Sequence, residues 1–464
     1  MARYFKFHSL EDIRDAANRL ALNLRFSDDL SPLFRPVDVG PFRTGNSLCI
    51  QPMEGCDGTL DGRPDELTFR RYRRFGAGGA KLIWGEACAI SEEARATPRQ
   101  LLIDEATAPD LERMLAGCRQ AHRDAIGDDA DLVVGLQLTH SGRYSYRRPL
   151  IVSRDPLLVA RTRSDARVLE DDDLARLVDQ YVAAARLARR CGFDFVDVKQ
   201  CHRYLLNELL GARSREGRYG GCFENRTRLA TEIIQAIRAE VPGLLIACRL
   251  NLYDGIPYRP GPDTESPGEP IEWAGKLDQT WGTSLTDPFT PDLAEPIAWV
   301  GRMHELGLGL LNTSLGNPYS SPHLLRPFEV PPPDGYHTPE HPLIGVDRHF
   351  RLTADVQRAF PDLPIVGSGY SYLQEYLPQA GAANLRDGRV MFVGVGRASF
   401  SMPDFATQLR EHGTLDRRRI CRTFSYCTAL MRAKHNEQGQ FASGCPPFDK
   451  EVYGPLWDLA RKKE

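Results

Sequence analysis

The chain of 464 residues alternates short runs of apolar and β-branched residues with longer amphipathic stretches. This alternation is typical of parallel strands joined by helices, because parallel neighbours need a crossover connection between them. The clearest helical stripes cover residues 171–190 and 226–240, and a further helix is expected over 9–24. Eight runs fit strands: 47–53, 81–84, 132–138, 193–199, 244–250, 309–313, 364–366 and 390–393. Eight strand–helix units predict a closed (β/α)8 TIM barrel of the α/β class rather than a doubly wound sheet.

Length alone would allow two or three domains, but a single barrel with insertions also reaches this size. We therefore expect an N-terminal extension over 1–45, the barrel over 46–412 and a small C-terminal extension over 413–464. Two long Pro-rich insertions, 253–296 and 317–346, each follow a predicted strand. In a barrel they would lie on the catalytic face, as lids or binding loops, with surface decoration as the alternative.

Composition excludes several classes of function. The 59 basic and 62 acidic residues leave no basic field for nucleic acid. No apolar run approaches the length of a membrane span, and the first residues lack the apolar core of a signal peptide. The 11 cysteines are scattered singly, which favours reduced thiols and a cytoplasmic location. We expect a small-molecule partner, no nucleic acid and no membrane, and leave a homo-oligomer open.

Residues 192–228 carry the densest chemistry. An apolar strand is followed at once by Lys199, His202 and Tyr204, and then by a Gly pair and a Glu-Asn-Arg turn. A cation, an imidazole and a phenol at the carboxyl end of a parallel strand can bind and protonate a polar substrate. The alternatives are that Lys199 pairs with Asp197 or Glu224, and that Tyr204 belongs to the core.

Other predicted strands also end in polar groups. Gln137 ends the third, and an amide can both donate to and accept from a ligand. Arg249 ends the fifth, where a buried guanidinium requires an anionic or carbonyl partner. The last two strands open into Gly-bearing turns, whose backbone amides suit a phosphate. These turns contain Gly367, Ser368 and Gly369, then Gly396 and Arg397.

These motifs, in this order over residues 40–410, resemble the old yellow enzyme family of FMN-dependent oxidoreductases. In that family the fourth strand ends in His-x-x-His or His-x-x-Asn, followed two residues later by Tyr, then YGG and ENR. Here Lys199 takes the place of the first His, and Glu54 the place of a Thr or Cys near the flavin carbonyl at C4. The resemblance implies an FMN site formed by Pro52, Met53, Glu54, Ala87, Gln137, Arg249, Gly367, Ser368, Gly369, Gly396 and Arg397.

The implied activity is an ene-reductase reaction that uses NADH or NADPH as electron donor and FMN as cofactor. Lys199 and His202 would bind a carbonyl or carboxylate group of the substrate, and Tyr204 would protonate carbon. The first alternative reverses the chemistry, with oxidation of an amine, ether or alcohol. The second is a flavin-free barrel that acts as a binding protein. The departures at Glu54 and Lys199 motivate both alternatives.

Three cysteines lie in the tail, at Cys421, Cys427 and Cys445. Larger members of the family hold a four-iron cluster here on four closely spaced cysteines. This tail offers three with a different spacing, so we expect no iron–sulfur cluster and no metal. Zinc held by the three thiols and His435 is a weaker alternative.

Overall fold

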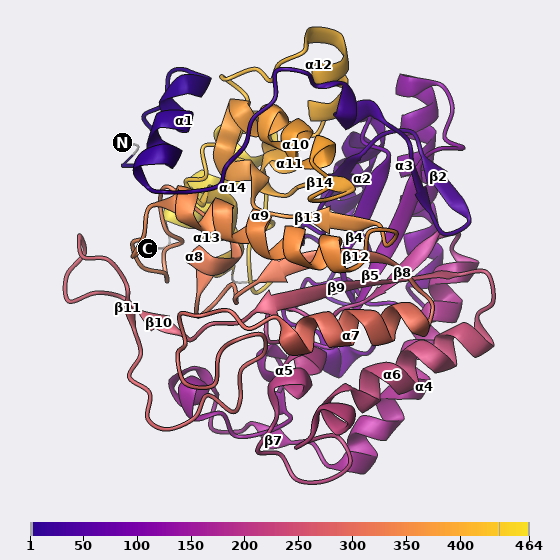
Figure 1. Ribbon diagram of the computed structural model, residues 1–464. Coiled ribbons are helices and arrows are strands. Elements are labelled where there is room, and N and C mark those ends of the chain that lie inside the picture. The colour runs from indigo at the N-terminus through magenta and orange to yellow at the C-terminus, as the bar shows by residue number, and fades with distance from the viewer. Residues whose placement is uncertain (1–2, 436, 463–464) are drawn as a thin grey trace.

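The computed structural model describes residues 3–435 and 437–462, and its centre is a closed barrel of eight parallel strands (Figure 1). Each predicted strand overlaps one barrel strand, so the predicted (β/α)8 architecture is confirmed. In barrel order the strands are β3 (Leu48–Ile50), β4 (Leu82–Ala89), β5 (Val133–Thr139), β8 (Phe195–Val198), β9 (Leu245–Tyr253), β12 (Leu308–Leu315), β13 (Ile365–Gly367) and β14 (Phe392–Val395).

Helices follow the strands and cover the outside of the barrel (Figure 1). The predicted helix over 171–190 coincides with α4, and that over 226–240 begins three residues earlier in α6. The first helix, α1 (Leu10–Arg19), is shorter than predicted, because Ala21 takes a left-handed conformation with φ of 54°. The outer helices are α2 (Glu66–Ala77), α3 (Ala108–Ile126), α4 (Asp171–Arg190), α6 (Phe223–Glu240), α7 (Ala294–Glu305), α9 (Pro342–Ala359), α10 (Leu377–Arg386) and α12 (Phe405–His412).

A hairpin of β1 (Val37–Val39) and β2 (Phe42–Thr44) closes the amino-terminal end of the barrel, where Val39 packs against the interior residues. The division into 1–45, 46–412 and 413–464 stays a prediction. The remaining short elements lie in loops and in the tail: β6 (Leu150–Ile151), β7 (Arg167–Val168), β10 (Tyr258–Arg259), β11 (Glu269–Pro270), α5 (Leu205–Gly211), α8 (Pro322–Leu325), α11 (Arg397–Ser401), α13 (Tyr426–Arg432) and α14 (Lys450–Arg461).

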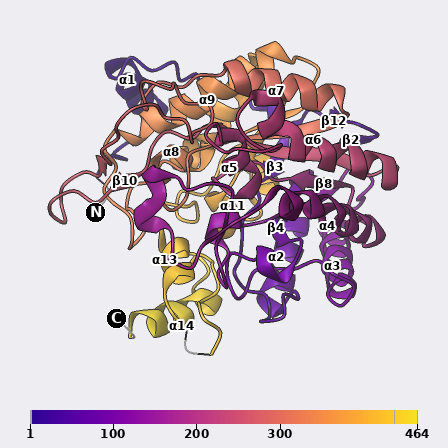
Figure 2. The same ribbon diagram turned by 90° about the horizontal axis from the view of Figure 1, so that it is seen from below.

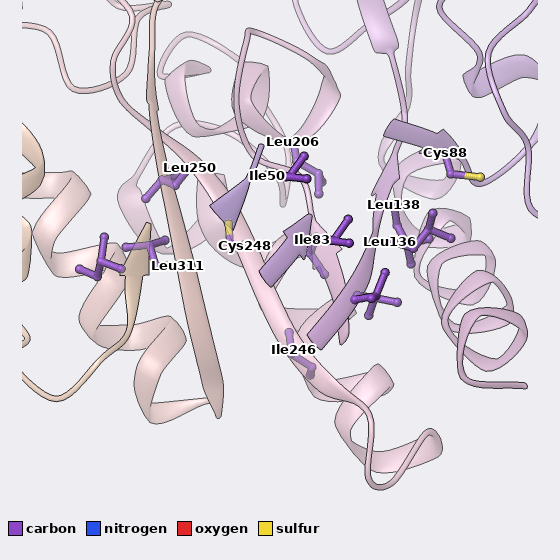
Figure 3. Packing of buried hydrophobic residues seen from close by; sticks show 14 of the residues in the cluster. Ile50, Ile83, Cys88, Leu136, Leu138, Leu206, Ile246, Cys248, Leu250 and Leu311 are labelled. Atoms are coloured by element: carbon purple, nitrogen blue, oxygen red, sulfur yellow. The ribbon is translucent and has the colours of Figure 1, made fainter. Parts of the chain in front are cut away.

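Strand residues alternate between the interior and the helices, because successive side chains of a strand point to opposite faces. Ile83, Leu136 and Ile246 belong to the large cluster shared with the outer helices, part of which Figure 3 shows. Their neighbours Leu82 and Ala247 belong to a separate interior cluster. The sequence of each strand therefore fixes which of its residues reach the barrel interior.

The interior changes from apolar to polar along the barrel axis. Near its amino-terminal end, Trp84 and Phe195 pack edge to face, with ring centroids 4.9 Å apart. Gly135 of β5 lies beside this pair. Because side chains alternate along a strand, Gln137 of β5 and Arg249 of β9 also point into the barrel, closer to its carboxyl end. The apolar layer closes one end of the barrel, and the polar layer opens toward the loops at the other.

The turn after β8 is strained. His202 and Arg203 both adopt left-handed conformations, with φ of 66° and 56°, which cost free energy in residues with a Cβ. Arg203 offsets this cost through a buried ion pair with Asp155 and a 2.7 Å hydrogen bond to the Gln279 carbonyl. The Arg203 backbone N–H also donates to Asn207 Oδ1 over 2.6 Å. These contacts hold the turn that carries the candidate catalytic side chains.

The C-terminal tail packs against the barrel with α13 and α14 side by side (Figure 2). Arg70 and Arg74 of α2 form ion pairs with Asp449, which lies just before α14. Within the described residues, no helix is both long and apolar enough to cross a membrane. Nor does this part of the chain contain a group of three or more His, Cys, Asp or Glu side chains that could hold a metal ion.

Replacement of Asp155 by Asn should destabilise the protein, because it leaves the Arg203 guanidinium buried without a counterion. We expect the free energy of unfolding to fall by about 3–5 kcal/mol, measured by urea denaturation. The control is Asp165→Asn, which breaks an exposed pair with Arg163 and should change stability by about 0.5 kcal/mol or less. Equal effects of the two substitutions would contradict the role assigned to Arg203.

Candidate active site

A cavity of about 550 Å³ opens at the carboxyl end of the barrel. The ends of seven barrel strands or the turns that follow them form its floor, and the eighth, β12, contributes through its loop. Helix α13 of the tail forms part of the opposite wall. Active sites of barrel enzymes occupy this face, so the cavity is the candidate active site.

The structure gathers nearly all of the predicted site residues in this cavity, although they come from distant parts of the chain. Gly367 is the exception: it stays in β13, where its carbonyl accepts a 3.3 Å hydrogen bond from Gln51 Nε2. The predicted residues that line the cavity are Pro52, Met53, Glu54, Ala87, Gln137, Lys199, His202, Tyr204, Arg249, Ser368, Gly369, Gly396 and Arg397. Their individual roles stay predictions.

Asp197 orients Gln137 at the cavity floor. The Asp197 Oδ2 atom accepts hydrogen bonds from Gln137 Nε2 over 2.6 Å and from Trp84 Nε1 over 2.8 Å. Its Oδ1 atom accepts from the backbone N–H of Arg249 over 2.7 Å. Burial raises the pKa of Asp197, while these donors act in the opposite direction. With its amide nitrogen engaged, Gln137 has its carbonyl oxygen left for a ligand.

Arg249 lies beside this network and lines the cavity with 8% of its surface exposed. Its Nε atom is buried and has no hydrogen-bond partner among the described residues. Burial lowers the pKa of the guanidinium, with Cys201 and Asp197 acting against that shift. Because a buried cation without a partner is costly, a ligand with an electron-rich edge would stabilise it.

Lys199 lies against the ring of Tyr204, with Nζ 3.9 Å from the ring centroid. Neither Asp197 nor Glu224 forms an ion pair with it in the described structure, so that alternative for Lys199 is not observed. Burial lowers the pKa of Lys199, and the nearby Cys201 and Glu54 oppose this shift. The ammonium is thus held at the cavity wall by a cation–π contact.

Tyr204 is buried, yet it lines the cavity, so it is more than core packing. Its hydroxyl lies 3.2 Å from that of Tyr319, and Tyr144 packs against Tyr319 with ring centroids 4.4 Å apart. Burial raises the pKa of Tyr204 well above its ordinary value, as do Tyr319 and Glu54. Tyr204 therefore keeps its proton at neutral pH, as a general acid must.

His202 projects from the strained turn, with Nε2 3.0 Å from Ser314 Oγ. Burial and the charges of Arg249 and Lys199 lower its pKa well below the ordinary value. The imidazole is therefore neutral at neutral pH and carries a single N–H. It can accept a hydrogen bond through one nitrogen while it donates through the other.

Glu54 lines the cavity rather than pointing away from it. Burial raises its pKa, and the charge of Lys199 is the largest effect that opposes this rise. A raised pKa favours the protonated acid, which can donate a hydrogen bond as the Thr or Cys of relatives would.

The end of the cavity where the resemblance places the FMN phosphate combines two Gly turns with Arg397. Gly369 has φ of 95°, a conformation that side chains with a Cβ avoid. The Nη2 atom of Arg397 donates to the Pro327 carbonyl, while its Nη1 atom is buried without a partner among the described residues. Burial lowers the pKa of Arg397, as expected for a guanidinium that lacks a counterion.

His140 and Arg143 follow β5, and the structure places them differently relative to the cavity. His140 is buried outside the cavity and its Nδ1 accepts from the Gly142 N–H over 3.1 Å, so it is structural. Its burial lowers its pKa to about 4. Arg143 reaches the cavity wall but forms a buried ion pair with Glu208.

Sequence reasoning missed part of the cavity wall. The second Pro-rich insertion contributes residues to the cavity and so is a binding loop, whereas the first contributes none. No motif marked the missed positions, because they come from this insertion, from a short loop and from the tail. They include Tyr144, Tyr319, Arg326, Thr428 and Arg432.

The cavity fits FMN in three respects. Gln137 and Arg249 can pair with the polar edge of the ring system, and the Arg249 Nε atom has no hydrogen-bond partner among the described residues. Gly369, Gly396 and Arg397 form a compact turn region suited to a phosphate ester. The cavity also leaves a wall of polar side chains, around Lys199 and Tyr204, for a second molecule.

Comparison with known proteins agrees with this fit. Residues 32–286 match the profile of the NADH:flavin oxidoreductase / NADH oxidase family, which is more than half of the chain. An NADPH dehydrogenase from Geobacillus sp. (strain WCH70) is 30% identical over 210 residues, or 44% of this chain and 59% of the relative. An N,N-dimethylglycine/sarcosine dehydrogenase from Chromohalobacter salexigens is 25% identical over 218 residues, which cover 45% of this chain and 30% of the relative.

Solved structures agree on the fold. A 2-naphthoyl-CoA reductase in complex with 2-naphthoyl-CoA superposes with a TM-score of 0.68 at 16% identity, covering 92% of this chain and 58% of that protein. An old yellow enzyme homologue from Zymomonas mobilis superposes with a TM-score of 0.58 at 22% identity, covering 82% of this chain and 92% of that protein.

The matched segments span 59% and 30% of the two curated relatives, so the substrate remains a matter for proposal. The resemblance to the old yellow enzyme family and the expected FMN and NAD(P)H chemistry are confirmed at the level of the family, which leaves the flavin-free alternative without support. The chain belongs to the NADH:flavin oxidoreductase / NADH oxidase family and is built on a (β/α)8 barrel.

Proposed function

We propose that the protein is an ene-reductase, which reduces an activated C=C bond with electrons from NADH or NADPH. The observation that carries this proposal is the wall formed by Lys199, His202 and Tyr204 on one side of the cavity. FMN, when bound, supplies the hydride chemistry that links the nicotinamide to the alkene. The side chains of this wall bind the substrate and supply its proton.

Lys199 and His202 bind the electron-withdrawing oxygen of the substrate. An ammonium donates as a point charge and stabilises negative charge that develops on that oxygen. The neutral imidazole adds one hydrogen bond, so the two groups act together on a carbonyl or carboxylate. The strained turn after β8 fixes their positions relative to each other.

Tyr204 donates the proton to the α-carbon. Its raised pKa keeps the hydroxyl protonated until the substrate becomes strongly basic. The Tyr319 hydroxyl lies 3.2 Å away and contributes to the raised pKa of Tyr204.

Oxidation of an amine, ether or alcohol is the second candidate. One relative bears the name N,N-dimethylglycine/sarcosine dehydrogenase, which favours amine oxidation. Lys199, Arg249 and Arg326 all line the cavity and would repel a protonated amine. Reduction of the bound flavin by an amine but not by NADH or NADPH would favour this candidate.

We also propose that the protein is cytoplasmic, because its cysteines are scattered singly along the chain.

Replacement of Tyr204 by Phe should lower kcat/KM for reduction of 2-cyclohexenone by about 100- to 10,000-fold, because it removes the general acid. The rate of flavin reduction by NADPH, measured by stopped-flow absorbance, should stay unchanged. His202→Ala should raise KM for the same alkene.

The matched control is Tyr219→Phe, which removes a hydroxyl bonded to Glu232 over 2.8 Å outside the cavity. It should leave both rates unchanged. If Tyr204→Phe and His202→Ala both left alkene reduction unaltered, the assignment of this wall would be wrong.

The purified protein should carry FMN, identified by its visible spectrum and by the mass of the released chromophore. Arg397→Met should weaken FMN binding by about 10- to 100-fold, the effect of one lost charged hydrogen bond. Riboflavin, which lacks the phosphate, should bind the wild type and the variant equally. An equal loss of affinity for FMN and riboflavin would show that Arg397 does not bind the phosphate.

A further inference from the structure

The cavity wall holds more positive charge than its acids can balance. Four of its cations have no ion pair with a carboxylate within the described part of the chain: Lys199, Arg249, Arg326 and Arg397. The other cationic lining residues are paired, Arg143 with Glu208, Arg163 with Asp165 and Arg432 with Asp334. Glu54 can offset at most one of the four, and burial favours its neutral form.

FMN accounts for only part of this surplus. Its phosphate carries a charge of about −1.5 to −2 at neutral pH. That charge matches Arg397 together with the backbone amides of the Gly turns. Arg249, beside Gln137 and Asp197, would pair with the polar edge of the ring system. Lys199 and Arg326 then remain for the other molecule in the cavity.

Arg326 is built into the wall rather than extended into solvent. It follows α8 in the loop after β12, and its Nη1 atom forms a hydrogen bond with Thr428 Oγ1 of α13. Its Nε and Nη2 atoms are buried without a partner in the described structure. Burial and the charges of Arg397 and Arg432 lower its pKa to about 9. A bound anion would relieve both the repulsion and the lost hydration.

Arg326 also lies on the side of the cavity where substrate is expected. Its charge acts on His202, whose pKa it helps to lower. Tyr319, the hydrogen-bond partner of Tyr204, opposes the fall in the pKa of Arg326. Arg326 thus lies in the same loop as Tyr319, which contacts the candidate proton donor Tyr204, and both residues line the cavity.

We propose that the substrate carries an anionic group, a carboxylate or a phosphate ester, which Arg326 binds beside the flavin. The inference rests on the proposed function only in placing substrate in this cavity. It assigns the substrate a negative charge separate from the oxygen held by Lys199 and His202. The binding loop and the tail hold this anion site in place through the contact between Arg326 and Thr428.

The test measures binding to the oxidised holoenzyme, so it does not depend on turnover. Benzoate and benzamide have nearly the same size but differ in charge, and both are titrated by the change they cause in the flavin spectrum. The wild type should bind benzoate at least about tenfold more tightly, the effect of one charged hydrogen bond. Arg326→Gln should remove this preference, and Arg326→Lys should restore part of it.

Two results would overturn the proposal. If Arg326→Gln kept the preference for benzoate while Lys199→Met abolished it, Lys199 and not Arg326 would bind the carboxylate. If Arg326→Gln weakened FMN binding but not riboflavin binding, as expected for Arg397→Met, Arg326 would belong to the phosphate site. Thr428→Val is the positioning control, and it should reduce the preference for benzoate without removing it. These measurements report ligand binding, so they can be made even if the protein does not reduce alkenes.

Discussion

The carboxylate of Asp197 is the contact on which the site depends. It lies in the barrel interior and accepts hydrogen bonds from Trp84 of β4, Gln137 of β5 and the backbone of Arg249 in β9. One side chain of β8 therefore sets the positions of groups on three other strands. A buried carboxylate is costly without donors, and two of the three residues that donate to it here, Gln137 and Arg249, line the cavity. Stability of the barrel and geometry of the floor are linked through this residue.

The wall opposite the floor is built differently. The loop after β12 brings in Tyr319 and Arg326, and the tail helix α13 brings in Arg432. Tyr319 contacts Tyr204 and Arg432, while Arg326 contacts Thr428 of α13. This wall depends on tertiary contacts between segments that are about a hundred residues apart. The floor can therefore be shared across a family, while the wall can differ from member to member and set the substrate.

Charge connects the two halves of the cavity. The floor and the turns around it hold Lys199, Arg249 and Arg397, and the wall adds the guanidinium of Arg326. Low solvent access strengthens each interaction, because fewer water molecules screen it. Such a cavity disfavours cationic molecules and favours anionic ones, which counts against oxidation of a protonated amine.

The sequence by itself determined the barrel and its floor. Strand periodicity places Gln137, Lys199 and Arg249 on the inner face, and parallel strands bring their carboxyl ends to one edge. The turn at His202, the Asp197 network and the position of Glu54 were decided only by the tertiary structure. So was the wall with Tyr319 and Arg326, because loop and tail residues have no periodicity that fixes their neighbours. Local patterns determine which face a strand residue occupies, but only packing decides which distant loops meet across it.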